Sequence, residues 1–248
     1  MKRFILLFTI SVLSSTLSFG QKKYEMVVEK TDGTESVFNT EDVARTYFRE
    51  RNGGDDTSCP DSNHPHLIDL GLPSGTKWAC CNVGAKKPEE FGGYYAWGDT
   101  EEKSWYDWST YIYCDGSLDS FHDLGSDISG TKYDVAHVKW GRSWVMPSHE
   151  QQLELLNNCT STWTKVNDVN GRKFTSMING KTIFLPAAGN HIKGELCNVL
   201  YGFYWAAKQG PGNSYYAFCI AFRPGEIWWD HIDRSVGQSV RPVVRSYH

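Results

Sequence analysis

This chain of 248 residues has no excess of positive charge, no cysteine pair with metal-binding or redox spacing and none of the short catalytic motifs that spacing reveals. A net charge of −4 and a pI near 6.1 argue against a nucleic-acid partner, which would select a basic surface. The seven cysteines include no C-x-x-C, which disfavours a zinc or thioredoxin-like site. No G-x-S-x-G, H-E-x-x-H or nucleotide-binding glycine loop occurs. The sequence therefore favours a protein that is not an enzyme.

The sequence has one long apolar run, which lies at the N-terminus, and lacks a second. Residues 1–20 contain Lys2 and Arg3, then the run FILLFTISVL, then small residues up to Gly20. This pattern is typical of a secretory signal peptide and predicts export, with cleavage near Gln21. The run is too short for a membrane span, so we expect a mature chain that does not span the membrane and resides in the periplasm, on the cell surface or outside the cell.

The next 45 residues divide into two short segments. Residues 21–50 hold two strand-like stretches around the turn signal Asp32-Gly33, which predicts a small β-hairpin unit. Such a unit is too small to be stable alone, so it could dock on another chain as a possible surface-assembly partner. Residues 51–65 are rich in Gly, Asp, Ser, Asn and Pro and predict a linker. The main domain is expected over residues 66–245.

One helix of the main domain can be read from both of its ends. Ser148 follows Pro147 and can cap the helix while Gln151 reaches back to the cap backbone. Apolar Leu153 and Leu156 share one face, and Asn158 suits the C-terminal end. The rest reads as short strands and glycine-rich loops. The sequence therefore predicts an α+β domain of mostly antiparallel short strands with one or two helices.

Aromatic residues are unusually abundant, at 14% of the chain, with 10 Trp and 13 Tyr. This is more than a core normally takes, so some rings should be exposed and available to stack on sugars or to anchor a protein. Strand alternation places one of Tyr215 and Tyr216, and one of Trp228 and Trp229, on the outer face of a C-terminal sheet. The predicted ligand-binding residues are Tyr204, Tyr215, Trp228, Trp229, Asp230 and His231.

Acidic residues are dense in a loop-rich stretch between residues 100 and 134. Carboxylates in such a loop can hold Ca²⁺, which prefers six to eight oxygen ligands. The spacing matches no calcium loop, so a solvated acidic loop is favoured, with Ca²⁺ as an open alternative and no other cofactor expected. The carboxylates concerned are Asp107, Asp115, Asp119, Asp123, Asp127 and Asp134.

Motifs spread over the main domain resemble a known family. They are L-G-L-P-S-G-T-K-W at 70–78, C-N-V-G-A at 81–85, P-E-E-F-G-G-Y-Y-A-W-G-D at 88–99, Y-D-W-S-T-Y at 106–111, A-H-V-K-W-G-R-S-W-V-M-P at 136–147, L-L-N-N-C-T at 155–160, I-F-L-P-A-A-G at 183–189, Y-G-F-Y-W-A at 201–206 and S-V-R-P-V at 239–243. They resemble the Fibrobacter succinogenes major paralogous domain, which is abundant in exported proteins of Bacteroidetes and Fibrobacteres. The resemblance implies a C-type-lectin-like fold, shared with formylglycine-generating enzymes, and an exported module for adhesion or ligand binding.

Three functions follow as hypotheses. The favoured one is a non-enzymatic recognition or adhesion module that binds a glycan or protein ligand through the aromatic C-terminal surface. The second is a structural subunit of a cell-surface assembly. The third, a formylglycine-generating-type oxidase, is disfavoured because that chemistry needs two close cysteines near the C-terminus, and only Cys197 and Cys219 are present there.

Overall fold

The computed structural model describes residues 25–29, 35–39, 65–115, 122–141, 143–211 and 215–244. The chain divides into two compact units, Met1–Glu50 and Arg51–His248. The predicted signal peptide and the predicted linker, apart from Pro65, lie outside the described residues. Within the described residues, none of the helices has the length and apolar character needed to cross a bilayer.

The first unit contains the predicted β-hairpin. Strands β1 (Glu25–Glu29) and β2 (Glu35–Asn39) pair in antiparallel register, with Val27 directly opposite Val37. Both valine side chains are more than half exposed, at 52% and 54%. The hairpin therefore presents an apolar cross-strand pair to solvent.

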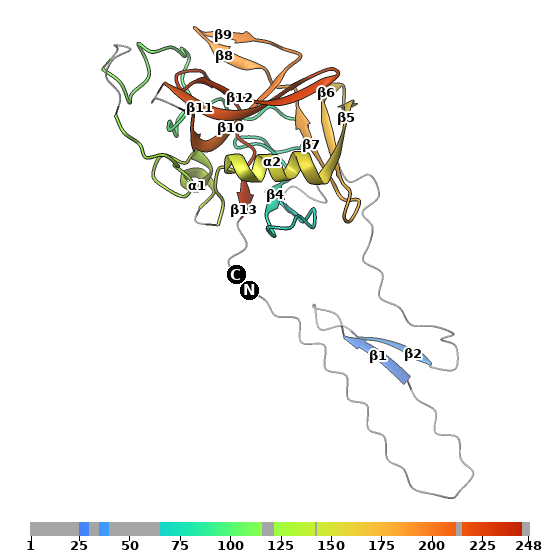
Figure 1. Ribbon diagram of the computed structural model, residues 1–248. Helices are drawn as coiled ribbons and strands as arrows, with labels where there is room; N and C mark the ends of the chain where they lie inside the picture. The colour runs from blue at the N-terminus through green and yellow to red at the C-terminus, as the bar shows by residue number, and fades with distance from the viewer. Residues whose placement is uncertain are drawn as a thin grey trace, which may run out of the picture. The chain divides into compact units, whose positions relative to one another are not determined.

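The second unit is mostly antiparallel sheet with two helices in its described part, as the sequence predicts (Figure 1). Its sheets have the strand orders β10-β11-β12, β13-β4-β3, β5-β6-β7 and β8-β9. The helices are α1 (Val135–Trp140) and α2 (His149–Asn158). The strands are β3 (Leu67–Ile68), β4 (Lys77–Ala79), β5 (Cys159–Val166), β6 (Val169–Ser176), β7 (Thr182–Pro186), β8 (Asn190–Ile192), β9 (Glu195–Cys197), β10 (Gly202–Gln209), β11 (Tyr216–Arg223), β12 (Glu226–Asp233) and β13 (Val243–Val244).

Helix α2 begins as its sequence predicts. The Ser148 hydroxyl accepts from the Gln151 backbone N–H, and the Gln151 side chain accepts from the Ser148 N–H. This capping box satisfies two backbone donors at the helix start. Figure 1 shows α2 running alongside the β10–β12 sheet, with β5–β7 at its C-terminal end.

The β10–β12 sheet separates two hydrophobic clusters, because alternate residues of each strand point to opposite faces. Trp205, Ala217 and Cys219 belong to the cluster on one face. Tyr204, Ile220 and Phe222 belong to the cluster on the other face, where α2 packs. Only part of that second face is buried, and the uncovered part carries the aromatic residues described next.

Candidate functional site

An exposed cluster of aromatic rings lies on the β11–β12 hairpin. We call it the aromatic surface and define it as His149, Tyr216, Phe218, Trp229 and His231. Trp229 is 52% exposed and His231 is exposed, while the other three rings are half-buried. The centroids of Phe218 and Trp229 lie 5.9 Å apart, and those of Tyr216 and His231 lie 5.4 Å apart. The rings thus form one continuous layer.

Strand register explains why these rings share a face. Phe218 lies opposite His231, and Tyr216 lies opposite Asp233, in the antiparallel ladder between β11 and β12. Directly opposed residues in a ladder point to the same side, as do residues two apart along a strand. Trp229 and His231 therefore project on the same side as Phe218 and Tyr216.

His149 joins the aromatic surface from another element. It is the first residue of α2, and its ring stacks on Phe218 with a centroid distance of 4.3 Å and an interplanar angle of 23°. Its edge also contacts Trp229, with centroids 5.7 Å apart. Burial lowers the pKa of His149, so the neutral ring is favoured at neutral pH. The capping box that starts α2 therefore also positions a ring beneath Trp229.

The structure separates the six residues that the sequence singles out. Trp229 and His231 belong to the aromatic surface, and Tyr215 lies next to it, with its ring centroid 6.2 Å from that of Tyr216. Trp228 and Asp230 project from the opposite face of β12, since they lie opposite Ala221 and Cys219. Trp228 packs there against Tyr201.

Tyr204 is a correction, because only 1% of its surface is exposed and it cannot touch a ligand on the surface. Its ring stacks on Phe222 inside the core. Its hydroxyl donates to the Pro186 carbonyl at 2.6 Å and lies 3.3 Å from the donor Asn82 Nδ2. Residues 202–207 of strand β10 are all buried, so neither face of this strand offers an exposed ring.

Sequence reasoning missed Phe218 and His149 as surface residues, and it took Tyr215 into the predicted set where alternation left Tyr216 equally open. Phe218 and Tyr216 could have been paired with His231 and Trp229 by counting outward from the Pro224-Gly225 turn of the hairpin. His149 carries no such signal, since its place depends on how α2 packs against the sheet. Tertiary packing alone brings it to the aromatic surface.

Charged groups border the aromatic surface. Glu150 Oε1 lies 2.5 Å from Lys208 Nζ, beside His149, and this hydrogen bond is the main reason that the pKa of Glu150 is lowered to about 2. At the outer edge of β12, the His231 N–H donates to Asp230 Oδ1 at 2.8 Å. Because that backbone donor is already bonded, the edge is less able to accept an added peptide strand.

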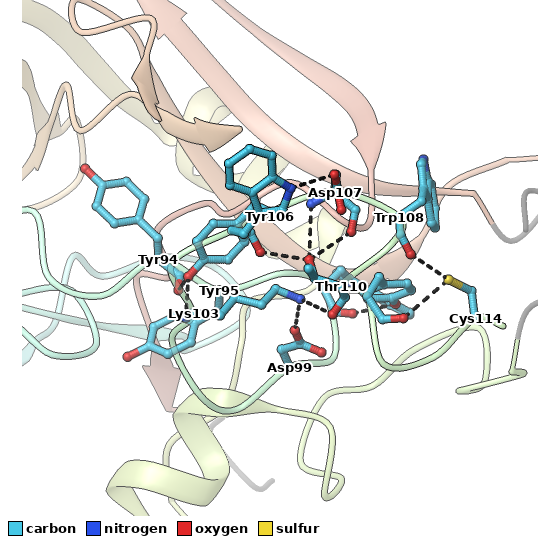
Figure 2. A network of polar contacts seen from close by, with 12 residues as sticks. Tyr94, Tyr95, Asp99, Lys103, Tyr106, Asp107, Trp108, Thr110 and Cys114 are labelled. Atoms are coloured by element: carbon cyan, nitrogen blue, oxygen red, sulfur yellow. Dashed lines mark hydrogen bonds and ion pairs between the residues drawn. The ribbon is translucent and has the colours of Figure 1, made fainter. Parts of the chain in front are cut away.

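A loop of residues 99–115 lies beyond Tyr215 and is held by a polar network (Figure 2). Lys103 Nζ donates to Asp99 Oδ2 at 2.7 Å and to the Thr110 carbonyl at 3.0 Å. Asp107 accepts from the indole of Trp105 at 2.7 Å and from the Ser109 backbone at 2.9 Å. The loop therefore has a defined shape although it contains no strand or helix.

Several carboxylates of the acidic stretch bind backbone donors of their own chain. Asp134 caps α1 through Oδ1, which accepts from Ala136 and His137, and its Oδ2 accepts from Gly130 and Met146. Asp123 and Asp127 each accept from the backbone two residues on, and Asp119 lies outside the described residues. Across the described ranges, no group of three or more His, Cys, Asp or Glu side chains is placed to hold a metal ion.

The two C-terminal cysteines lie in different settings. Cys219 is fully buried in β11, where burial raises the pKa of its thiol, whereas Cys197 lies half-buried on β9. Both thiols are free. A raised thiol pKa disfavours the thiolate that copper binding and nucleophilic chemistry need.

The chain was compared with family models, curated proteins and solved structures. No family model matches it. No curated protein and no solved structure matches it either.

Proposed function

We propose that this chain is an exported, non-enzymatic recognition or adhesion module with a C-type-lectin-like fold, which binds a glycan through the aromatic surface. The observation that carries the proposal is the setting of Trp229. Its ring is half exposed, yet it contacts His149 and Phe218, which hold it in one orientation. A rigid exposed ring loses little entropy when an apolar ligand face stacks on it.

A glycan fits this surface better than a peptide strand does. Sugar rings offer C–H faces for stacking on aromatic rings, and their hydroxyls can bond with His231 and with the Glu150–Lys208 pair. A peptide that extends the sheet would instead need the outer edge of β12, where Asp230 already accepts from the His231 N–H. A protein ligand is the alternative, which a glycan array without a hit would favour.

The test is a glycan array screened with residues 21–248, with and without Ca²⁺. We expect a Ca²⁺-independent hit that quenches tryptophan fluorescence and is lost in Trp229→Ala. Trp105→Ala is the matched control, because Trp105 is similarly exposed, at 46%, but lies in the 99–115 loop. Glycan binding that survives in Trp229→Ala would place the site elsewhere. An array with no hit would contradict glycan recognition.

A structural role in a surface assembly is the second candidate, and the first unit supports it. Val27 and Val37 form an exposed apolar pair on a two-stranded hairpin, which is too small to be stable unless something covers it. If the hairpin docks on a partner, Val27→Ser with Val37→Ser should reduce surface assembly. Unchanged assembly in this double variant would exclude the hairpin as the contact.

A further inference from the structure

We propose that the binding site extends beyond the aromatic surface onto Tyr215 and Trp108, and that its ligand is a neutral sugar chain of several units. This inference rests on the proposed function and adds the class and length of the ligand. We call the combined set of rings the aromatic row. It runs from His149 and Trp229 through Phe218, His231 and Tyr216 to Tyr215 and Trp108.

Ring-to-ring contacts connect the row without a break. From His231 the centroid distance is 5.4 Å to Tyr216, then 6.2 Å from Tyr216 to Tyr215, then 5.9 Å from Tyr215 to Trp108. Each step is similar in size to one pyranose ring. A single sugar could cover only one or two of these rings, so a row of this length suits a chain.

Trp108 reaches the correct face through a contact with β12. Its indole donates to the Asp233 carboxylate. Burial raises the pKa of Asp233, and this hydrogen bond offsets part of that rise. Asp233 lies opposite Tyr216 and two residues from His231, so it projects from the face that carries the aromatic surface. This contact fixes Trp108 at the end of the row.

The backbone around Trp108 is held independently of any ligand. Cys114 Sγ donates to the Trp108 carbonyl at 3.2 Å, and Thr110 Oγ1 donates to the Trp105 carbonyl at 2.8 Å. Lys103 ties this part of the loop to the buried Asp99. Figure 2 shows Trp108 at one end of this network and Tyr94 at the other. A ring held in this way is ready to stack, which reduces the entropy cost of binding.

The charges along the row select against acidic chains. Asp233 lies beside Trp108, and Glu150 lies beside His149 at the other end. The cation near that end, Lys208, is already in an ion pair with Glu150. The Asp233 carboxylate would repel a uronic-acid or sulfated chain and the Glu150–Lys208 pair offers it no net positive charge, whereas a neutral chain meets no such penalty.

The experiment compares short and long neutral sugars by calorimetry on residues 21–248. The probes are cellobiose and cellohexaose, xylobiose and xylohexaose, and mannobiose and mannohexaose, with polygalacturonate as the acidic probe. For the series that binds, we expect the hexasaccharide to bind at least tenfold more tightly than the disaccharide. Trp108→Ala should remove that advantage and leave disaccharide affinity unchanged.

A second variant tests whether a loss of affinity in Trp108→Ala comes from the missing ring or from a disrupted loop. Trp108→Phe keeps a ring for stacking but loses the indole donor to Asp233 that fixes its position, so it should retain part of the hexasaccharide advantage. Equal affinity for short and long sugars, a full advantage in Trp108→Ala, or tighter binding of polygalacturonate would overturn the extended neutral site. These outcomes leave the proposed function standing if Trp229→Ala abolishes binding. Failure of every sugar to bind would instead overturn both.

Discussion

Two side chains of one sheet, Trp229 on β12 and Tyr204 on β10, show how burial divides the tyrosines and tryptophans of this chain into two roles. Trp229 projects into solvent, whereas Tyr204 is enclosed between Phe222, Asn82 and the Pro186 carbonyl. A buried hydroxyl must find hydrogen-bond partners, because an unpaired polar group in the core is costly. The Tyr204 hydroxyl meets this requirement and therefore belongs to the stability of the domain.

Tyr204→Phe should destabilise the domain and leave ligand binding unchanged. The substitution removes the hydrogen bond from the Tyr204 hydroxyl to the Pro186 carbonyl, which keeps its bond from the Ala188 N–H, so we expect a cost of about 0.5–1.5 kcal/mol. Urea unfolding measures the loss, and affinity for any array hit measures binding. Reduced affinity at full stability would instead return Tyr204 to the binding site.

The stability of the domain should fall between neutral and mildly acidic pH, and His149 should contribute to the fall. Its folded pKa is below the ordinary value of 6.5, so the unfolded chain takes up the proton first as the pH falls. Unfolding is therefore favoured as the pH drops below about 6.5. Among nearby charges, Glu150 acts against this shift and Lys208 adds to it.

The measurement is the unfolding free energy of wild type and His149→Phe at pH 7.5 and pH 5.5. The variant keeps the stack on Phe218 and lacks the titrating group, so its loss over this range should be smaller. His191, whose pKa is also lowered by burial, remains in both proteins and cancels in the comparison. Identical pH dependence would show that His149 does not titrate in this range.

At the level of elements, much of the secondary structure follows from local signals. The capping box of α2, the first hairpin and the C-terminal strands can all be read from caps, turns and alternation. The face of a strand is harder to assign, because alternation leaves both Trp228 and Trp229 as candidates. The packing of α2 on one side of the sheet decides between them, and no local pattern encodes it. The same holds for His149 and Trp108, which reach the aromatic row from distant segments.

Asp134 is the residue that links α1 to its surroundings, and Asp134→Asn should be strongly destabilising. Its carboxylate is buried and accepts four backbone N–H groups, and an amide nitrogen would face donors in place of an acceptor. Hydrogen bonds to charged groups contribute roughly 1.5–3 kcal/mol each, so we expect a loss of at least about 2 kcal/mol.

Asp127→Asn is the matched control for this prediction. Asp127 is exposed and accepts from one backbone N–H, that of Ser129. Chemical unfolding of both variants should show a large loss for Asp134→Asn and a small one for Asp127→Asn. Equal losses of unfolding free energy would mean that the four hydrogen bonds of Asp134 stabilise the domain no more than the one bond of Asp127 does.

On the scale of the whole domain, the first and last described strands of the second unit meet in one sheet, since β13 pairs with β4 and β4 with β3. Arg241 strengthens this closure from within the core. Its guanidinium donates to Asn82 Oδ1 at 2.8 Å, to the Cys80 carbonyl at 2.9 Å and to the Phe184 carbonyl at 2.9 Å. One side chain thus joins three segments that are distant in sequence.

Arg241→Met should therefore lower the unfolding free energy of the whole domain by about 3 kcal/mol or more, since it leaves several buried acceptors unpaired. Arg223→Met is the control, because Arg223 is exposed and pairs with Glu226 on the surface, so its loss should hardly change stability. Thermal unfolding of the two variants makes the comparison. A small effect of Arg241→Met would show that its contacts are not needed for closure.

The direct junction between α2 and β5 also limits how the length of this chain can change. Asn158 ends the helix, and Cys159 is both its cap and the first strand residue. One residue added to the helix would turn everything before it by about 100° relative to the strand, with no intervening loop to absorb the rotation. Gln152 and Leu155 would then leave the core. Insertions should be tolerated at open turns such as Gly225, where an added Cβ atom would meet no neighbouring atom, and rejected at this junction.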